Sequence, residues 1–383
     1  MIETEIVKDL VNYLEGHPDA GEAFNEAFSK ASASGILKKY DILSLADYIV
    51  FIDGLFKWIP SAKTPTHVHE QFCLFYYILD LSPVVDLQLA SASVEWYTWF
   101  SQWIIKYSEQ IIKYMDTPKS INDAAVATFY KSANYHMEDY LVPPGGWKSI
   151  NDFFARRIDP SVRPIAEPDN DYAIVSPADG SYSGCWDISS NGTVDISFMG
   201  LPWDLSVLFQ NEEYAQHFKD GHFIHLSVDC HDYHRQHAPV CGVVKDAKVI
   251  PGICYLGVDV AQNEAGEPQF IARRRLMNSG RGFEGKDACK GYQIQQPRGL
   301  VLIDSPIFGL VCVLVVGIGQ TSPVSLAVKA RDEIQKGQEI SSCRMGGCDV
   351  FVFFQKSPGI GSSFPDSDFP SCSFKMGQAI SIA

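Results

Sequence analysis

The hydrophobic pattern of the chain changes at a cluster of proline and glycine residues, and this change constrains the fold more than any other feature. Before VPPGGWKS (142–149), apolar residues recur at three- and four-residue spacing, as in EIVKDLVNYLEG (5–16), which is typical of amphipathic helices. After it, short runs such as CDVFVFF (348–354) are rich in β-branched and aromatic residues and alternate with turns. We therefore expect an α+β protein, with a helical N-terminal domain at residues 1–145 and a β-rich domain at residues 146–383.

Two more helical segments, DILSLADYIVFIDGLFKWI (41–59) and VEWYTWFSQWIIKYSEQIIKYM (94–115), carry many aromatic residues. We interpret these rings as packing between helices. The alternatives are a wall of a substrate channel or a membrane-facing surface. In the β-rich domain, DEIQKGQEI (332–340) predicts a sharp turn through Lys336 and Gly337. Biotinyl- and lipoyl-type β sandwiches have a similar hairpin-like turn, so we expect a sandwich of this kind.

The charge of the chain excludes some partners. With 31 basic and 46 acidic residues, its net charge of -15 argues against nucleic acid, because phosphate contacts need clustered Lys and Arg. The longest apolar run, GLVCVLVVGIG (309–319), is too short to span a bilayer and is typical of a buried strand. The N-terminus is acidic and amphipathic, unlike a signal peptide, and no Walker loop or GxGxxG segment is present. We expect a soluble, cytoplasmic protein without a transmembrane segment or a bound nucleotide.

Five of the ten histidines lie within residues 221–240, and a metal site, a catalytic base or a chance gathering of polar residues would each explain them. They are His222, His225, His231, His234 and His237. The last three recur every third residue, which would bring their side chains together only on a helix. Pro239 and the strand-like flanks argue against a helix, so we expect no metal site.

Four segments taken together resemble the phosphatidylserine decarboxylase family, whose members are self-processing, pyruvoyl-dependent enzymes. In chain order they are DFFARRIDPSVRPI (152–165), SPADG (176–180), DYHRQHAPVCG (232–242) and GGC (346–348). Their order and separation match the family, and the similarity extends over residues 150–357. The helical N-terminal region resembles in layout the soluble branch of the family that acts on tryptophan.

The resemblance implies that the chain is a zymogen that cleaves itself between Gly347 and residue 348. In the family, a serine at this site attacks the preceding carbonyl, a base removes the serine α-proton, and elimination and hydrolysis leave an N-terminal pyruvoyl group. This ketone condenses with the substrate amine and accepts electrons when carbon dioxide leaves. Mapped by motif, Asp179 would orient the imidazole of His237, which would act as a base toward residue 348. His234 would lie near the ketone, and the other three clustered histidines would be packed on strands or exposed.

The chain departs from the family at the reacting position, which holds Cys348 instead of serine. A thiol is more acidic and more nucleophilic than an alcohol, so the first acyl shift should be easy once His237 helps to deprotonate it. Cys348 could then still become a pyruvoyl group. Alternatively, the chain stays whole, and Asp179, His237 and Cys348 form a triad that passes an acyl group to an amine or to water. An engineered replacement of serine by cysteine is a third explanation.

Two more departures accompany the cysteine. Asp349 follows the reacting position, where small hydroxyl residues are usual, and it places a negative charge beside the reacting centre. The segment LMNSGRG (276–282) replaces the NER stretch expected in the membrane enzymes. This replacement and the missing membrane anchor both weaken the case for phosphatidylserine as the substrate.

The leading hypothesis is a pyruvoyl-type carboxy-lyase that decarboxylates an amino acid or a related small amine-bearing acid. Its cofactor would be a pyruvoyl group derived from Cys348, with no metal and no nucleotide. The runner-up is an unprocessed Cys-His-Asp acyltransferase or hydrolase on the same scaffold, and a non-catalytic binding relative comes third. The sequence leaves the oligomeric state open, and a homodimer is one option.

Overall fold

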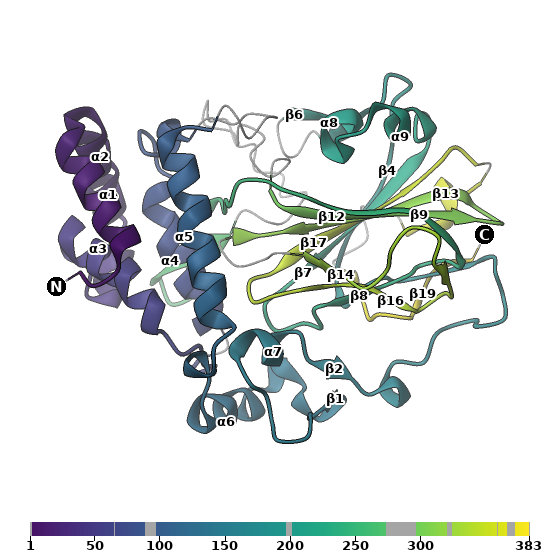
Figure 1. Cartoon of the computed structure of the whole chain (residues 1–383), viewed down its shortest axis with the longest axis horizontal. Coiled ribbons are helices and arrows are strands. Elements are labelled where there is room, and N and C mark those ends of the chain that lie inside the picture. The colour runs from purple at the N-terminus through teal and green to yellow at the C-terminus, as the bar shows by residue number, and fades with distance from the viewer. Residues whose placement is uncertain are drawn as a thin grey trace.

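The computed structural model describes residues 2–64, 66–88, 97–196, 201–272, 296–319, 324–357, 359–365 and 372–382. It confirms the expected α+β class, because a helical N-terminal region precedes a mainly β region (Figure 1). The segment LMNSGRG (276–282) lies outside the described residues. Within those residues, no helix combines the length and the apolar character needed to cross a membrane.

The N-terminal region is largely helical, and a capping side chain marks the start of α3, α5 and α6. Its helices are α1 (Glu5–Gly16), α2 (Pro18–Ala33), α3 (Leu45–Gly54), α4 (His67–Leu79), α5 (Trp99–Met115) and α6 (Asp123–Lys131). Helix α1 has the predicted bounds, whereas α3 and α5 begin later than the apolar pattern predicts. The reason is local: the side chain of Ser44 accepts a hydrogen bond from the backbone N–H of Asp47, and Thr98 does the same for Ser101. Each hydroxyl satisfies a helix N–H that has no partner within its own helix.

The β region is built on an eight-stranded sheet of order β15-β9-β12-β13-β17-β7-β4-β18. Its strands are β4 (Gly180–Asp187), β7 (His222–Val228), β9 (Gly242–Ile250), β12 (Arg298–Ser305), β13 (Gly309–Gly317), β15 (Glu333–Ile334), β17 (Cys348–Phe354) and β18 (Cys372–Phe374). A three-stranded sheet of order β14-β16-β8 contains β8 (Arg235–His237), β14 (Val324–Leu326) and β16 (Glu339–Cys343). All neighbours in both sheets pair in antiparallel fashion.

Shorter strand pairs complete the fold. They are β1 (Tyr140–Leu141) with β2 (Arg157–Ile158), β3 (Ala173–Val175) with β19 (Ala379–Ile382), β5 (Thr193–Ile196) with β6 (Leu201–Asp204), and β10 (Val258–Gln262) with β11 (Pro268–Ala272). The short helix α7 (Ile150–Phe154) lies between β1 and β2 in the chain. It begins at Ser149, whose side chain caps it by accepting a hydrogen bond from the Asp152 N–H.

The two faces of the eight-stranded sheet are covered by different layers (Figure 1). Successive side chains on a strand point to opposite faces. Along β17, Val350 and Val352 therefore pack on one face, in a cluster that includes Ile340 of the three-stranded sheet. Phe351 and Phe353 pack on the other face, against helices α8 (Leu205–Phe209) and α9 (Glu212–His217). Cys348 belongs to the first face, so its side chain lies between the two sheets.

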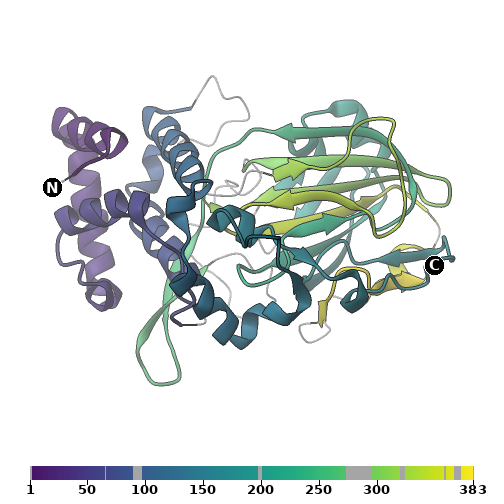
Figure 2. The same ribbon diagram turned by 60° about the horizontal axis from the view of Figure 1, so that its bottom comes forward.

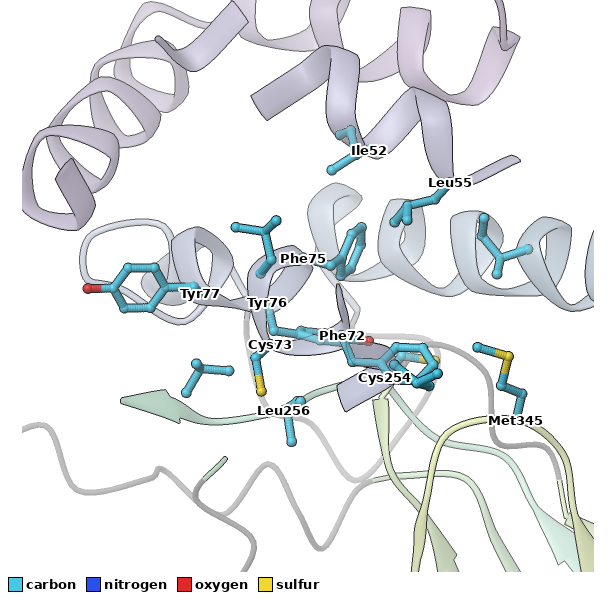
Figure 3. Close-up of a cluster of buried hydrophobic side chains, with 14 of the residues drawn as sticks. Ile52, Leu55, Phe72, Cys73, Phe75, Tyr76, Tyr77, Cys254, Leu256 and Met345 are labelled. Atoms are coloured by element: carbon cyan, nitrogen blue, oxygen red, sulfur yellow. The ribbon is translucent and has the colours of Figure 1, made fainter. Parts of the chain in front are cut away.

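The helical region and the β region share one hydrophobic core. Figure 2 shows the N-terminal helices beside one end of the sheets. Helix α4 contributes Phe72 and Tyr76 to this core, and the β region contributes Cys254, Leu256 and Met345. Figure 3 shows these side chains lying against one another. Because one cluster contains residues from both regions, burial of apolar surface links their stabilities.

The predicted sharp turn at Lys336 and Gly337 is present, and Gly337 has a φ of 80°. The two strands that flank this turn do not pair with each other. Strand β15 pairs with β9 of the large sheet, whereas β16 pairs with β8 and β14 of the small sheet. The physical reason is that Ile334 and Ile340, on either side of the turn, are both buried in the core between the sheets. The turn thus carries the chain from one sheet to the other.

Candidate active site

The segment that contains the predicted cleavage site is buried inside the protein. Residues 345–349 are all buried, and Gly346 has a φ of 145°, which favours glycine. The backbone N–H of Ile318 donates a hydrogen bond of 3.1 Å to the carbonyl oxygen of Gly347. Cys348 follows as the first residue of β17, between β13 and β7. The peptide bond between Gly347 and Cys348 is therefore held in a fixed backbone arrangement.

The N-terminal helices hold the residues just before this bond. The side chain of Arg344 forms an ion pair with Asp116, which follows helix α5. Asn151 of α7 accepts a hydrogen bond of 3.1 Å from the Met345 N–H, and its own amide donates to Asp116 at 3.0 Å. The Met345 side chain lies in the shared core near Phe72 of α4 (Figure 3). The helical region thus positions the cleavage segment directly.

The Cys348 sulfur lies in a polar contact that the sequence did not predict. Cys348 is fully buried, and the side-chain amide of Gln236 donates to its sulfur at 3.5 Å. The amide oxygen of Gln236 accepts a hydrogen bond of 2.8 Å from the Ser341 hydroxyl and a weaker one of 3.9 Å from the Cys343 thiol. Gln236 occupies the first variable position of the YHRxHxP pattern, which residues 233–239 of the DYHRQHAPVCG segment match. The only sequence signal was an amide between two motif histidines, which does not reveal a contact with another strand.

His237 is held by two groups on the opposite side of β8. Its Nδ1 faces the Gly337 carbonyl oxygen at 2.7 Å, and its Nε2 faces the Tyr233 hydroxyl at 3.0 Å. A carbonyl oxygen can only accept, so Nδ1 carries the proton and Nε2 accepts from the hydroxyl when the ring is neutral. Burial lowers the pKa of His237, although the Gly337 carbonyl, Glu339 and Asp179 act in the opposite sense. A neutral imidazole is therefore favoured here.

Strand alternation places Gln236 and His237 on opposite faces of β8. The Cys343 N–H donates to the His234 carbonyl oxygen at 2.9 Å, which continues the β8–β16 pairing by one residue. The backbone at His234 thus extends the ladder by one residue, and strand alternation predicts that its side chain lies on the same face of β8 as Gln236. The His234 ring is fully buried and stacks on Phe154 of α7, with ring centroids 4.3 Å apart.

Asp179 is buried in a separate set of contacts. One carboxylate oxygen accepts from the Met376 N–H at 2.8 Å, and the other lies 3.1 Å from Arg163 and 3.2 Å from Lys375. Among the described residues, the ring nitrogens of His237 contact Tyr233 and Gly337, and neither is hydrogen-bonded to Asp179. The SPADG segment still lies against β8, because the His237 N–H donates to the Pro177 carbonyl at 2.8 Å. The structure therefore gives the three residues of the predicted triad three separate sets of hydrogen bonds.

The other clustered histidines occupy three different places. His222 lies 2.8 Å from Asp187 at a surface pocket. His225 is fully buried, as strand packing predicts, but it also has polar partners. His231 has a ligand atom within 4.8 Å of those of Asp229 and Asp232, a group that excludes His234 and His237. The cluster in the sequence is therefore not one site in space.

Comparisons with known proteins agree with the motifs. The family profile described as phosphatidylserine decarboxylase matches residues 150–381, which is more than half of the chain. Phosphatidylserine decarboxylase proenzyme 3 of Schizosaccharomyces pombe is 28% identical over 240 residues, covering 63% of this chain and 22% of that protein. The phosphatidylserine decarboxylase proenzyme of Saccharophagus degradans is 29% identical over 240 residues, covering 60% of this chain and 77% of that protein.

The name of a third relative does not mention phosphatidylserine. Decarboxylase iboD of Amanita muscaria is 26% identical over 260 residues, covering 64% of this chain and 70% of that protein. The profile match spans every motif described above, from α7 through the SPADG and YHRxHxP segments to the buried GGC turn. This chain therefore belongs to the phosphatidylserine decarboxylase family.

Proposed function

We propose that this chain is a self-processing decarboxylase whose pyruvoyl group is made from Cys348 and whose substrate is an amino acid or a related small amine-bearing acid. One observation carries the proposal. The buried Cys348 sulfur accepts a hydrogen bond from Gln236, and it follows a Gly347 carbonyl that accepts one from the Ile318 N–H. The nucleophile and the carbonyl it would attack thus each have a hydrogen-bond donor in place. Family membership supports the same chemistry.

In the first step, the Cys348 sulfur attacks the Gly347 carbonyl carbon. The peptide C–N bond breaks, the Cys348 nitrogen takes up a proton, and a thioester remains. The Ile318 N–H, 3.1 Å from the Gly347 oxygen, is suited to stabilise the negative charge that develops there. The rest of β17 can stay in place during this step, because the strand is paired with β13 and β7 from Cys348 onward.

The second step separates the chain into two fragments. Removal of the Cys348 α-proton breaks the Cβ–S bond, so the sulfur leaves on Gly347 as a thiocarboxylate. Water then replaces the nitrogen at residue 348, ammonia departs, and a pyruvoyl group remains. The sulfur on the upstream fragment is a chemical mark that processing at a serine would not leave. Detection of this sulfur would show that Cys348 was the nucleophile in the cleavage.

His234 is the better supported base for this processing. Strand alternation directs His234 to the side of Gln236 and Cys348, whereas His237 is turned to the other face of β8 and bound by Gly337 and Tyr233. We therefore assign proton transfer at residue 348 to His234 and a structural and orienting role to His237. Cleavage should be lost in His234→Ala and retained, at a reduced rate, in His237→Gln.

A pyruvoyl group at residue 348 would supply a ketone that condenses with an amine and takes up electrons during decarboxylation. The site fits such a group, because residue 348 lies in a buried, desolvated position with an amide donor beside it. The position of the helices supports a small substrate. They pack on Met345 and contact Arg344, next to the cleavage bond, so the protein itself covers this side. The Amanita muscaria relative, named simply a decarboxylase, is compatible with a substrate other than a phospholipid.

Intact-mass measurement of the purified protein tests the proposal. The expected result is two fragments split before residue 348, with an upstream fragment that ends in a thiocarboxylate or its hydrolysis product. Borohydride with an amino-acid substrate should then trap an adduct on the downstream fragment. Cys348→Ala should give one intact chain, and Cys348→Ser should cleave without leaving sulfur on the upstream fragment. A wild-type chain that stays intact and traps no adduct would overturn the proposal.

The intact-thiol acyltransferase is less well supported by the geometry. His237, the base which that mechanism requires, has both ring nitrogens engaged elsewhere. No observation favours it over the decarboxylase.

A further inference from the structure

His225 and Asp349 form a buried contact on the sheet face opposite to Cys348. Nε2 of His225 lies 3.3 Å from Oδ1 of Asp349, and Nδ1 of the same ring lies 2.9 Å from the Ser183 hydroxyl. His225 is fully buried and Asp349 is 8% exposed. The three groups come from the neighbouring strands β4, β7 and β17, in which His225 faces Phe351 and Asp349 faces Ser227. The contact thus crosses the middle of the sheet.

These two groups depend on each other. Among the described residues, neither Nε2 of His225 nor Oδ1 of Asp349 meets the geometry of a hydrogen bond, and the 3.3 Å contact brings these two buried atoms together. A buried carboxylate without a partner is costly, and the imidazole supplies the compensating contact. The order hydroxyl, imidazole, carboxylate is that of a hydrolase triad. With His225 fully buried in the sheet, however, no substrate reaches the ring.

Asp349 is also the residue bonded to the reacting one. The Asp349 nitrogen forms the peptide bond to residue 348. This residue is Cys348 before cleavage and the new chain terminus afterwards. Because Cys348 and Asp349 point to opposite faces of β17, anchoring one side chain fixes the direction of the other. The negative charge of Asp349 consequently lies across the sheet, paired with His225, and not beside the sulfur.

We infer that His225 is a positioning residue for the chemistry at residue 348, and that it acts by holding Asp349 at the start of β17. This inference rests on the proposed function. Before cleavage, the contact fixes the face of β17 from which the Cys348 side chain projects, and thereby limits the positions of its sulfur relative to the Gly347 carbonyl. After cleavage, the chain begins at residue 348, the link to Gly347 is gone, and the side-chain contact of Asp349 restrains the free end. The pair thus replaces a covalent restraint that processing removes.

The test compares wild type with His225→Leu/Asp349→Leu and with Asp349→Asn. Replacing both partners by apolar residues leaves no unpaired buried charge, so the double variant should fold with a melting temperature close to wild type. Its cleavage should be slower by roughly tenfold or more, because small displacements of reacting groups have effects of that size. Asp349→Asn keeps a group that can hydrogen-bond the imidazole and should cleave at nearly the wild-type rate.

A second readout uses the processed enzyme. The kcat of the cleaved double variant, calculated per mole of pyruvoyl group, should be lower than that of wild type. Its KM should be close to that of wild type. A purely structural role would lower the melting temperature and leave this kcat unchanged. A double variant that cleaves and turns over like wild type would overturn the inference while leaving the proposed function intact. A wild-type chain that is never cleaved would overturn both.

Discussion

The side-chain amide of Gln236 donates a hydrogen bond to the Cys348 sulfur at 3.5 Å. The two residues are far apart in the sequence and meet because β8 of the small sheet lies over the start of β17 in the large sheet. An N–H directed at a sulfur stabilises the thiolate more than the thiol, since hydrogen bonds to charged groups are the stronger ones. We therefore propose that Gln236 helps to prepare the nucleophile for the attack on Gly347.

We expect Gln236→Leu to slow self-cleavage. The hydrogen bond to a developing thiolate is worth about 1.5–3 kcal/mol, which corresponds to a rate loss of roughly tenfold to a hundredfold. The rate can be followed by the appearance of the two fragments on a gel. Ser341→Ala is the matched control, because it removes a donor to the amide oxygen of Gln236 and leaves the N–H in place. Equal rates in wild type and Gln236→Leu would remove Gln236 from the reaction.

The stability of the protein should depend on pH through His237. Its pKa is lowered mainly by burial, so between the lowered value and the ordinary value of about 6.5 the unfolded chain binds more protons than the folded one. The free energy of unfolding should therefore rise with pH across this window and fall as the pH drops through it. The charges of Glu339 and Asp179 raise the pKa of His237 and that of Arg235 lowers it, so these three groups adjust the position of the window.

Urea denaturation at about pH 7.5 and about pH 5.5, on either side of the ordinary histidine pKa, measures this effect. His237→Gln keeps an amide that can bond Gly337 and Tyr233 but cannot titrate. Its free energy of unfolding should change less between the two pH values than that of wild type. The same pH dependence in both proteins would assign it to other groups.

Asn151 should link the helical region to processing. Asn151→Ala leaves the buried Met345 N–H without its acceptor, which costs about 1–3 kcal/mol, and it frees the residues before the cleavage bond. We expect a lower melting temperature and slower cleavage. Lys8→Ala removes an exposed ion pair with Glu5 within α1 and should change neither property. If Asn151→Ala melts earlier but cleaves at the wild-type rate, the helical region only supports the fold.

The sequence predicted the parts of this protein that depend on local patterns. The bounds of α1 and the runs that became β13 and β17 follow from the spacing of apolar residues and from nearby turn residues. The four motif segments also predicted membership of the phosphatidylserine decarboxylase family, which the family profile confirms. Where a helix began later than expected, as at Thr98, a single capping hydroxyl outweighed the apolar pattern.

The contacts that distinguish this site depend on which strands become neighbours, and a single sequence does not contain that information. Gln236 reaches Cys348 only because the β8–β16 sheet packs on the large sheet. His225 meets Asp349 only because β7 pairs with β17 in one particular register. The prediction that Asp179 orients His237 used motif order alone, and it could not include the competing cations Arg163 and Lys375.

Those cations lead to the last prediction, which concerns the role of Asp179. The carboxylate is 1% exposed and is the partner of Arg163, whose side chain is itself mostly buried. Asp179→Asn keeps an acceptor for the Met376 N–H but removes the charge, so we expect a loss of stability of about 3–5 kcal/mol, the scale of a broken buried ion pair. Arg163→Met, which breaks the same pair from its other side, should cost a similar amount.

Both variants should still cleave when they are assayed well below their melting temperatures, because the contacts of Asp179 lie with Arg163, Lys375 and Met376. Thermal melting and fragment formation, measured on the same preparations, separate the two roles. An Asp179→Asn protein that is as stable as wild type but remains uncleaved would mean that this carboxylate acts directly on the histidine pair. The hydrogen bonds of His237 to Gly337 and Tyr233 would then have to rearrange before the reaction, and Arg163→Met would be expected to cleave normally.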